Sequence, residues 1–360
     1  MMADPTIQTF CCHHSRNGTD MAVMVMDEFN THSYNALCLT SSIIGIMGAL
    51  YQILPREEHV RPNVSTRGRQ IIIWLAVADL LASLGVMVRS ALWMNYKSMI
   101  PIEDDTSNVL FCAITSAWTQ YFYTATWIWT LCYAIDTHLL LRNRDSHTSV
   151  YHSVSWGLPA VLTATGLSIL YYPNANCHNL RSLKGALVRV LPNYCATYVP
   201  ITVVMVANPI IYFFSSKDME VAVFGAYSQI TSKERSLVHD LKLKFTLINI
   251  SFYLCWLPNL VNGILLWTLW FDLPIKVIIV VWYIMALMNP LQALLNAIIY
   301  RRWTPGMQKL KLPFNVNCFS NFKSRQEEPN AETPLLGHRP PSRLRLTDHP
   351  RNSINALSSM

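Results

Sequence analysis

The chain has 360 residues, of which 52% are hydrophobic and only 14% are charged. Since soluble domains carry about 25% charged residues, this composition excludes an ordinary soluble domain and favours a membrane protein. The formal net charge is +7. Because the basic residues gather between apolar runs, membrane topology and contact with anionic lipid explain this charge better than nucleic-acid binding does.

Seven apolar runs follow one another along the chain, at residues 33–54, 70–94, 111–136, 152–172, 194–214, 242–270 and 276–300. Their lengths are close to the roughly 20 residues that a helix needs to cross a bilayer. Backbone groups in hydrocarbon must pair internally, and the runs are too long for the strands of a β-barrel. The sequence therefore predicts an all-α membrane protein, a seven-transmembrane helix bundle over residues 33–300.

The orientation of the bundle follows from its lysines and arginines. If the N-terminus lies outside, 21 of the 28 fall on the cytosolic side, six fall outside and Arg89 lies within the second run. The positive-inside rule then predicts a luminal or extracellular segment over 1–32 and a cytosolic tail over 301–360. The first 32 residues lack a long apolar signal-peptide core, so we expect the first run to act as an uncleaved signal-anchor.

Two cysteines lie on the predicted outer side near the mouth of the bundle: Cys112 at the start of the third run and Cys177 in the second outer loop. The oxidising compartment makes a disulfide between them plausible. Cys195 is a rival partner for either of them, and Cys11 and Cys12 are also luminal.

Modification signals lie in both terminal segments. Asn17 is the one N-x-S/T sequon that this topology places in the lumen, so we expect a glycan there. The tail begins with an amphipathic segment, RRWTPGMQKLKL, and then becomes rich in Pro, Asn, Ser and charge, which predicts disorder. Cys318 follows the amphipathic segment and is a palmitoylation candidate.

Asp79 in LAVADLL and Arg89 in MVRSALW are charged residues within one apolar run. Such residues are costly in a bilayer and usually functional. Ten residues of helix place them about 15 Å apart, so they cannot pair directly. We expect Asp79 to bond Asn289 or Asn296 of the last run. Arg89 either snorkels to the interface or faces the cavity and binds an anionic group of a ligand.

A proline lies inside the sixth run, in FYLCWLPN at residues 252–259. Pro258 removes one backbone hydrogen bond and predicts a kink. In the third run the outer aromatic residues, Trp118 to Tyr123, could line a pocket, and Asp136 ends the run on the cytosolic side. The chain has no zinc-protease, P-loop or Ser/His/Asp pattern, so we expect no enzyme, no metal and no cofactor.

These motifs resemble those of rhodopsin-like G-protein-coupled receptors. The similarity rests on FxxCWLP in the sixth run, LAVADL in the second, Cys112 in the third and Asn289-Pro290 in the seventh. It implies switch or structural roles for Asp79, Asp136, Phe252, Pro258, Asn289 and Pro290.

The sequence also departs from that class. Thr137 stands where the D/E-R-Y triplet has its arginine, so His138 and the basic third inner loop are candidate substitutes in the inner lock. Asn289-Pro290 is followed by LQA, so the tyrosine of the NPxxY motif is expected to be missing, with Tyr300 too late in the chain. Thr119 occupies the position where amine receptors have an aspartate.

A closer resemblance is to the ocular albinism type 1 receptor family, over residues 7 to 305. It rests on segments such as TFCC at 9–12, GVMVRSALW at 85–93, CYAIDTHL at 132–139 and MNPLQALL at 288–295. The resemblance implies a receptor of melanosomes or late endosomes and lysosomes, or also of the plasma membrane, that couples to inhibitory-type G proteins. Its implied ligand is a tyrosine-derived amino acid such as L-DOPA, and we expect the ligand-binding residues to be Arg89, Thr119, Tyr123, Trp256 and Asn259.

The family also implies cytosolic partners beyond the heterotrimeric G protein, namely arrestin-like adaptors and sorting adaptors. Leu335 and Leu336 in EEPNAETPLLGH form a candidate dileucine sorting signal. Two alternatives remain open at this point. One is a multi-pass transporter or channel for small solutes, in which Asp79, Arg89 and Asp136 line the path. The other is a scaffold or trafficking protein of an organelle membrane.

Overall fold

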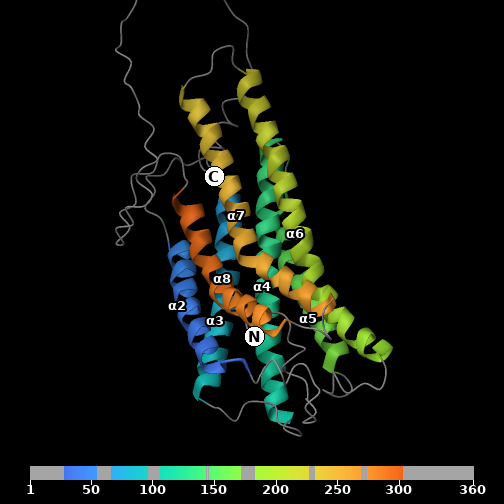
Figure 1. The fold of residues 1–360 in the computed structure, drawn as a ribbon. Coiled ribbons are helices and arrows are strands. Elements are labelled where there is room, and N and C mark those ends of the chain that lie inside the picture. The colour runs from blue at the N-terminus through green and yellow to red at the C-terminus, as the bar shows by residue number, and fades with distance from the viewer. Residues whose placement is uncertain are drawn as a thin grey trace, which may run out of the picture.

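A computed structural model describes residues 28–54, 66–95, 106–142, 144, 146–171, 183–226, 232–268 and 274–302. Within these ranges the chain forms seven long helices and no strand (Figure 1). They are α2 (Thr31–Ile53), α3 (Thr66–Asn95), α4 (Thr106–Leu141), α5 (Thr148–Tyr171), α6 (Leu183–Ala226), α7 (Ser232–Thr268) and α8 (Ile275–Arg302). The predicted seven-helix bundle is confirmed, and no predicted run extends more than two residues beyond its helix.

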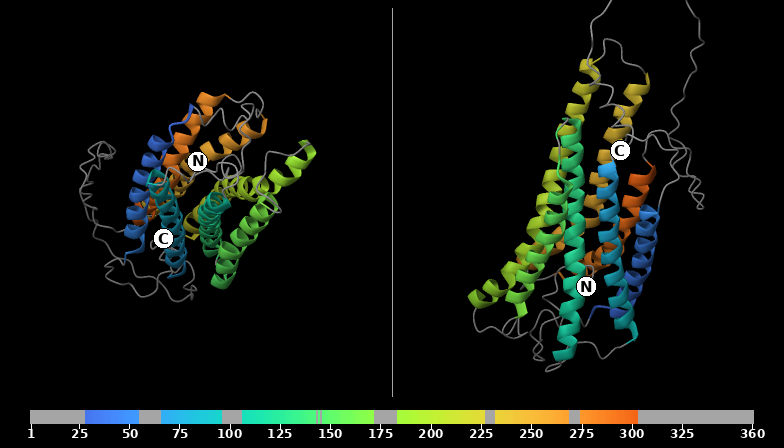
Figure 2. Two further views of the ribbon diagram at one scale, coloured as in Figure 1. Left: turned by 90° about the horizontal axis from the view of Figure 1, so that it is seen from below. Right: turned by 180° about the vertical axis from the view of Figure 1, so that it is seen from behind.

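Six of these helices are long and apolar enough to cross a membrane, and α4 is the exception. The reason lies in its position, because α4 packs against α3, α5 and α6 (Figure 2). Many of its buried side chains are polar, including Thr119, Gln120, Thr124, Thr126 and Thr130. A central helix is covered by protein rather than by lipid, so it tolerates polar residues that a peripheral helix would not. The protein is a multi-pass membrane protein.

The helices alternate in direction through the bundle. We call the end at which α2, α4, α6 and α8 begin the predicted luminal end, and the end at which they finish the predicted cytosolic end. Contacts at both ends fit this alternation: Arg89 near the end of α3 bonds Ser116 near the start of α4, and Arg142 at the end of α4 bonds Asp218 near the end of α6. Which side of the membrane each end faces stays a prediction.

Two helices continue well past their apolar runs. The 44 residues of α6 and the 37 of α7 include most of what was expected to be a third inner loop. Figures 1 and 2 show these extensions rising beyond the other helices. The apolar runs measure only the part of a helix that lies in hydrocarbon. Beyond it, Lys242 pairs with Glu220, and Met219, Val238 and Leu241 form a small apolar cluster that holds the two extensions together.

Glycine allows α2 to lie close against α8. A Cβ atom at Gly48 would be 2.5 Å from the Cα of Leu294, and one at Gly45 would collide with the carbonyl of Pro290. Small residues let membrane helices approach to backbone contact. This packing fixes α8, which carries several residues of the candidate site, against α2.

We therefore expect Gly48→Ala to destabilise the folded protein by about 1–3 kcal/mol, since the added methyl group forces the two backbones apart. Gly157→Ala is the matched control, because a Cβ atom there meets nothing within 4 Å. The measurement is the unfolding midpoint of each purified variant in detergent. Equal midpoints for the two variants would contradict the close packing of α2 on α8.

Candidate functional site

Asp79 is buried in α3 and accepts a hydrogen bond of 2.9 Å from Nδ2 of Asn296 in α8. This confirms Asn296 as the expected partner. Asn289 is not a partner of Asp79, because it pairs with Asn259 of α7 instead. Two turns of helix separate Asn289 from Asn296, about 10.5 Å, so one carboxylate cannot bond both.

The Asp79 contact also fixes the register of the last helix. Asn296 is followed four residues later by Tyr300, which is the asparagine-to-tyrosine spacing of the NPxxY motif, with Ala297 in place of the proline. Tyr300 is buried and its ring lies 5.0 Å from that of Tyr133 in α4. No tyrosine follows Asn289-Pro290 at this spacing, as expected, and Tyr300 instead has this spacing from Asn296.

A ladder of polar contacts joins α7 to α8. Trp256 Nε1 donates to Gln292 Oε1 at 2.5 Å, the amides of Asn259 and Asn289 exchange two hydrogen bonds of 2.9 and 3.2 Å, and Trp282 Nε1 donates to Asn262 Oδ1 at 2.9 Å. The ladder spans Pro258 and Pro290, where each helix lacks a backbone donor. Side chains therefore hold the two helices together at the level where their backbones are weakest.

Gln292, Asn262 and Trp282 were missed by the sequence reasoning. The sequence does contain a signal for Asn262, because polar or indole side chains recur every three residues at 256, 259 and 262 within an apolar run. That spacing places them on one face of a helix.

Two of the predicted ligand residues touch each other. The rings of Tyr123 and Trp256 meet edge to face at 4.9 Å, and Trp127 approaches the same indole at 4.8 Å. Phe252 belongs to the same apolar core. Thr119 lies one turn before Tyr123 and its hydroxyl donates to the carbonyl of Thr115.

Arg89 is buried, with 2% of its surface exposed. Its Nη1 donates to Ser116 Oγ at 2.8 Å and its Nη2 lies 3.7 Å from Cys112 Sγ. The snorkelling alternative is therefore wrong, because polar side chains of α4 receive the guanidinium inside the bundle. Ser116 precedes Tyr123 by two turns, so the cation lies about 10.5 Å along α4 from the aromatic pair.

The predicted disulfide is tested only in part. Cys112 is disulfide-bonded and Cys195 is a free thiol, so Cys195 is excluded as a rival partner. Cys177, Cys11 and Cys12 lie outside the described residues, and the pairing with Cys177 stays a prediction. Asn17, Cys318, Leu335 and Leu336 also lie outside the described residues.

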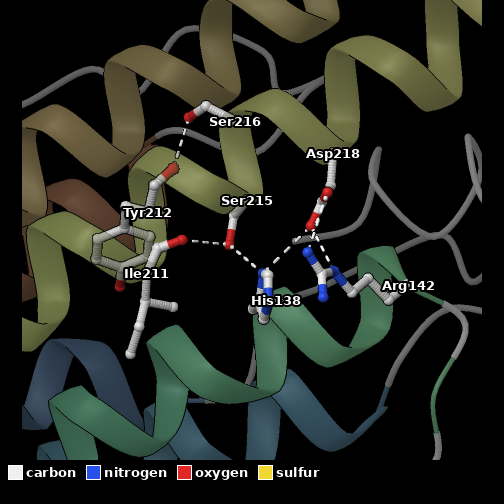
Figure 3. A network of polar contacts seen from close by, with 7 residues as sticks. All are labelled: His138, Arg142, Ile211, Tyr212, Ser215, Ser216 and Asp218. Carbon is white, nitrogen blue, oxygen red and sulfur yellow. Dashed lines mark hydrogen bonds and ion pairs between the residues drawn. The ribbon is translucent and has the colours of Figure 1, made fainter.

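At the predicted cytosolic end, α4 is bonded to α6 through Asp218 (Figure 3). Arg142 donates to this carboxylate at 2.7 and 3.4 Å, and His138 Nδ1 lies 3.5 Å from it and 3.3 Å from Ser215 Oγ. The hydrogen bonds and charge of Asp218 raise the pKa of Arg142. His138, one of the two candidate substitutes for the missing arginine, thus contacts α6 directly.

Asp136 and Thr137, which precede His138 in the triplet, bond to partners other than Asp218. Asp136 is buried and accepts from Ser146 Oγ at 2.7 Å and from Tyr151 in α5 at 3.5 Å. Thr137 donates to the carbonyl of Tyr133 in its own helix. Asp136 therefore faces α5 while His138 faces α6, so these two side chains hold α4 to two different neighbours.

A second basic residue is enclosed nearby. Lys244 of α7 has no exposed surface, and its Nζ lies 5.6 Å from the ring centres of both Tyr133 in α4 and Tyr300 in α8. An ammonium group over aromatic faces is stabilised by the ring quadrupoles. Lys244 thereby joins three helices, and its contact on α4, Tyr133, lies one turn before Thr137, which stands where the rhodopsin-like class has its arginine.

Seven packed helices, a buried Asp–Asn pair and a proline-kinked tryptophan helix define a bundle of the seven-transmembrane receptor type. A family model described as "Ocular albinism type 1 protein" matches residues 2–338, and the chain belongs to this family. Human G-protein coupled receptor 143 is 27% identical over 361 aligned residues, which cover 95% of this chain and 87% of the human protein. Cyclic AMP receptor-like protein C of Dictyostelium discoideum is 24% identical over 202 residues, 53% of each chain.

We expect the amide pair of Asn259 and Asn289 to be energetically coupled. A double-mutant cycle of Asn259→Ala, Asn289→Ala and the double variant should give a coupling of about 0.5–1.5 kcal/mol in unfolding experiments, as polar pairs between membrane helices do. The control cycle pairs Asn259→Ala with Asn35→Ala, whose amide bonds within α2. A coupling of zero in the first cycle would contradict the ladder.

Proposed function

We propose that this protein is a G-protein-coupled receptor of an intracellular membrane, melanosomal or endolysosomal, that responds to a small molecule and acts without catalysis. Both relatives carry receptor names, and one of them is named as G-protein coupled. The observation that carries the proposal is the pair of contacts that Trp256 makes beside Pro258. There the Trp256 indole packs against Tyr123 on one side and bonds Gln292 on the other, so a ligand beside Tyr123 acts on α7 and α8 together.

The ligand we propose is a tyrosine-derived amino acid such as L-DOPA. Its carboxylate would bind Arg89, a buried guanidinium near the predicted luminal end, which offers a planar fork for a carboxylate. Its ring would pack near Tyr123 and Trp256, and Asn259 follows Trp256 on the same face of α7. The neutral Thr119 makes a ligand bound by its amine alone less suitable.

Switching requires two states whose affinities for the ligand differ. In the resting state, Asp218 holds α6 to α4 and Lys244 holds α7 to the tyrosines of α4 and α8. A change at Trp256 alters the α7–α8 ladder, and the kink at Pro258 lets the predicted cytosolic part of α7 swing outward. The opened end would then receive a G protein of the inhibitory type, and later an arrestin-like adaptor. Sorting adaptors would recognise Leu335 and Leu336 in the tail.

The transporter alternative predicts charged side chains along an open path. Asp79, Arg89 and Asp136 are instead buried and bonded to side chains of neighbouring helices or their connections. These contacts favour a receptor, whose charges hold helices in place.

The test of the proposal is ligand-dependent nucleotide exchange. The full-length chain in proteoliposomes, with an inhibitory-type heterotrimer, should accelerate GTPγS binding when L-DOPA is added. Arg89→Ala should abolish the response, and Arg89→Gln, which can still donate to Ser116, should separate the loss of charge from the loss of packing. Both variants should retain most of the wild-type unfolding temperature.

An Arg89→Ala receptor with unchanged L-DOPA potency would overturn the proposed carboxylate contact. Uptake of L-DOPA into the same proteoliposomes without any nucleotide exchange would favour the transporter.

A second prediction concerns the contact between α4 and α6. Asp218→Asn removes the charge that both Arg142 and His138 face, so we expect ligand-independent nucleotide exchange to rise several-fold. Lys217→Gln is the matched control, since Lys217 is adjacent to Asp218 on α6 and its Nζ lies 4.5 Å from the ring centre of Phe213 in the same helix. It should stay near the wild-type rate. Equal basal rates in the two variants would refute the role of Asp218 as a latch.

A further inference from the structure

Polar side chains of α4 and α6 meet in the interior, where α5 lies against them, near the predicted luminal end. Gln120 of α4 donates from Nε2 to Oγ1 of Thr197 in α6 at 3.0 Å. Asn193 precedes Thr197 by one turn, on the same face of α6. All three residues are buried.

Glycine brings the third helix into this cluster. A Cβ atom at Gly166 of α5 would lie 2.9 Å from Asn193 Oδ1, 3.1 Å from its Cα and 3.3 Å from the Cβ of Ala196. The absence of a side chain at Gly166 is thus what admits the Asn193 amide between the helices. Thr163 lies one turn before Gly166 on α5, and Thr124 lies one turn after Gln120 on α4.

These buried groups are not satisfied by the described part of the chain. The atoms without a hydrogen-bond partner there are Asn193 Oδ1 and Nδ2, Gln120 Oε1, Thr124 Oγ1 and Thr163 Oγ1. Other threonines of these helices, such as Thr126, Thr130 and Thr165, donate to the carbonyl four residues earlier. Buried polar groups are almost always hydrogen-bonded. The unpaired atoms of Gln120 and Asn193, with those of Thr124 and Thr163 one helical turn away along α4 and α5, therefore indicate an external partner.

The chemistry of that partner follows from the side chains. The cluster contains amides and hydroxyls and no ionisable group, so it has no charge to balance an anion or a cation. It offers at least one donor, Asn193 Nδ2, and at least two acceptors, Asn193 Oδ1 and Gln120 Oε1. A hydroxyl or a carboxamide both donates and accepts, and either would satisfy it.

The cluster is close to the ligand site proposed above. On α4, Gln120 follows Ser116, the partner of Arg89, by one turn, about 6 Å, and precedes Tyr123 by another. Ser116 and Gln120 lie on one face of α4. Helix α3 contacts this face at Ser116, through Arg89, and α6 contacts it at Gln120, through Thr197. A ligand of amino-acid size can therefore reach both Arg89 and this cluster.

We propose that Gln120, Asn193 and Thr163 form a subsite that binds an uncharged hydroxyl or carboxamide group of the ligand, while Arg89 binds its anionic group. The inference rests on the proposed function for the presence of a ligand. Beyond that function, it specifies which chemical group of the ligand the receptor recognises and which residues bind that group.

The experiment measures equilibrium binding to the full-length receptor in nanodiscs, without G protein. The probes are L-tyrosine, 4-carbamoyl-L-phenylalanine and L-phenylalanine, which share the amino-acid group and differ at one ring position. The wild type should bind one of the first two about tenfold more tightly than phenylalanine, and the tighter one identifies the group as a hydroxyl or a carboxamide. Asn193→Leu and Gln120→Leu should reduce this preference to about onefold.

Three further variants make the result specific. Asn208→Leu is the matched control, because Asn208 is also buried without a partner in the described chain but lies 15 residues, about 22 Å, further along α6. It should keep the tenfold preference. Gly166→Ala displaces the Asn193 amide without removing it and should also reduce the preference. This variant tests the subsite even if a leucine variant folds poorly. Arg89→Ala should weaken all three probes equally.

Binding of all three probes with equal affinity to the wild type would overturn the subsite and leave the proposed receptor function standing. A preference that survives Asn193→Leu and Gln120→Leu would do the same, and the cluster would then hold only water. Absence of binding by all three probes would overturn both the subsite and the proposed ligand class.

Discussion

Hydrocarbon offers no hydrogen bonds, so polar side chains within this bundle depend on partners inside the bundle, either on their own helix or on a neighbouring one. That constraint fits the position of α4 among α3, α5 and α6, where protein rather than lipid surrounds its buried threonines and its glutamine. It also explains the pairing of Asp79 with Asn296 and of Arg89 with Ser116. The two charged residues of the second apolar run thus join α3 to α8 and to α4.

Two levels of contact control α7. Near its middle, the ladder around Pro258 and Pro290 joins it to α8 through side chains. Near the predicted cytosolic end, Lys244 joins it to two tyrosines, while Asp218 separately holds α6 to α4. A movement of α7 must therefore change both levels, which couples the two ends of the bundle. The basic residue used at the inner level comes from α7, whereas the rhodopsin-like class places its arginine on the helix that here is α4.

The sequence predicted the seven helices well because a bilayer imposes a length and an apolar composition on each segment, and both are visible without knowing which helices are in contact. It also gave two candidate partners for Asp79, of which Asn296 is the one bonded. It named Tyr123 and Trp256 as ligand-binding residues, and their rings touch. It missed the helical extensions of α6 and α7, since those are stabilised by pairs such as Glu220 with Lys242 rather than by hydropathy. It did not recognise the spacing between Asn296 and Tyr300, because a proline is easier to find in a sequence than the Asp79–Asn296 contact that sets the register of α8.

The length of α7 has a mechanical consequence. Between Pro258 and its first residue, Ser232, the helix runs for 26 residues, a lever arm of roughly 39 Å at the rise of an α-helix. A bend of 5° at the proline would displace the tip by about 3 Å, which is larger than the shift that breaks a hydrogen bond. A change of one side-chain position beside Trp256 can thus be amplified mechanically into a displacement of several ångströms at the predicted cytosolic end of α7.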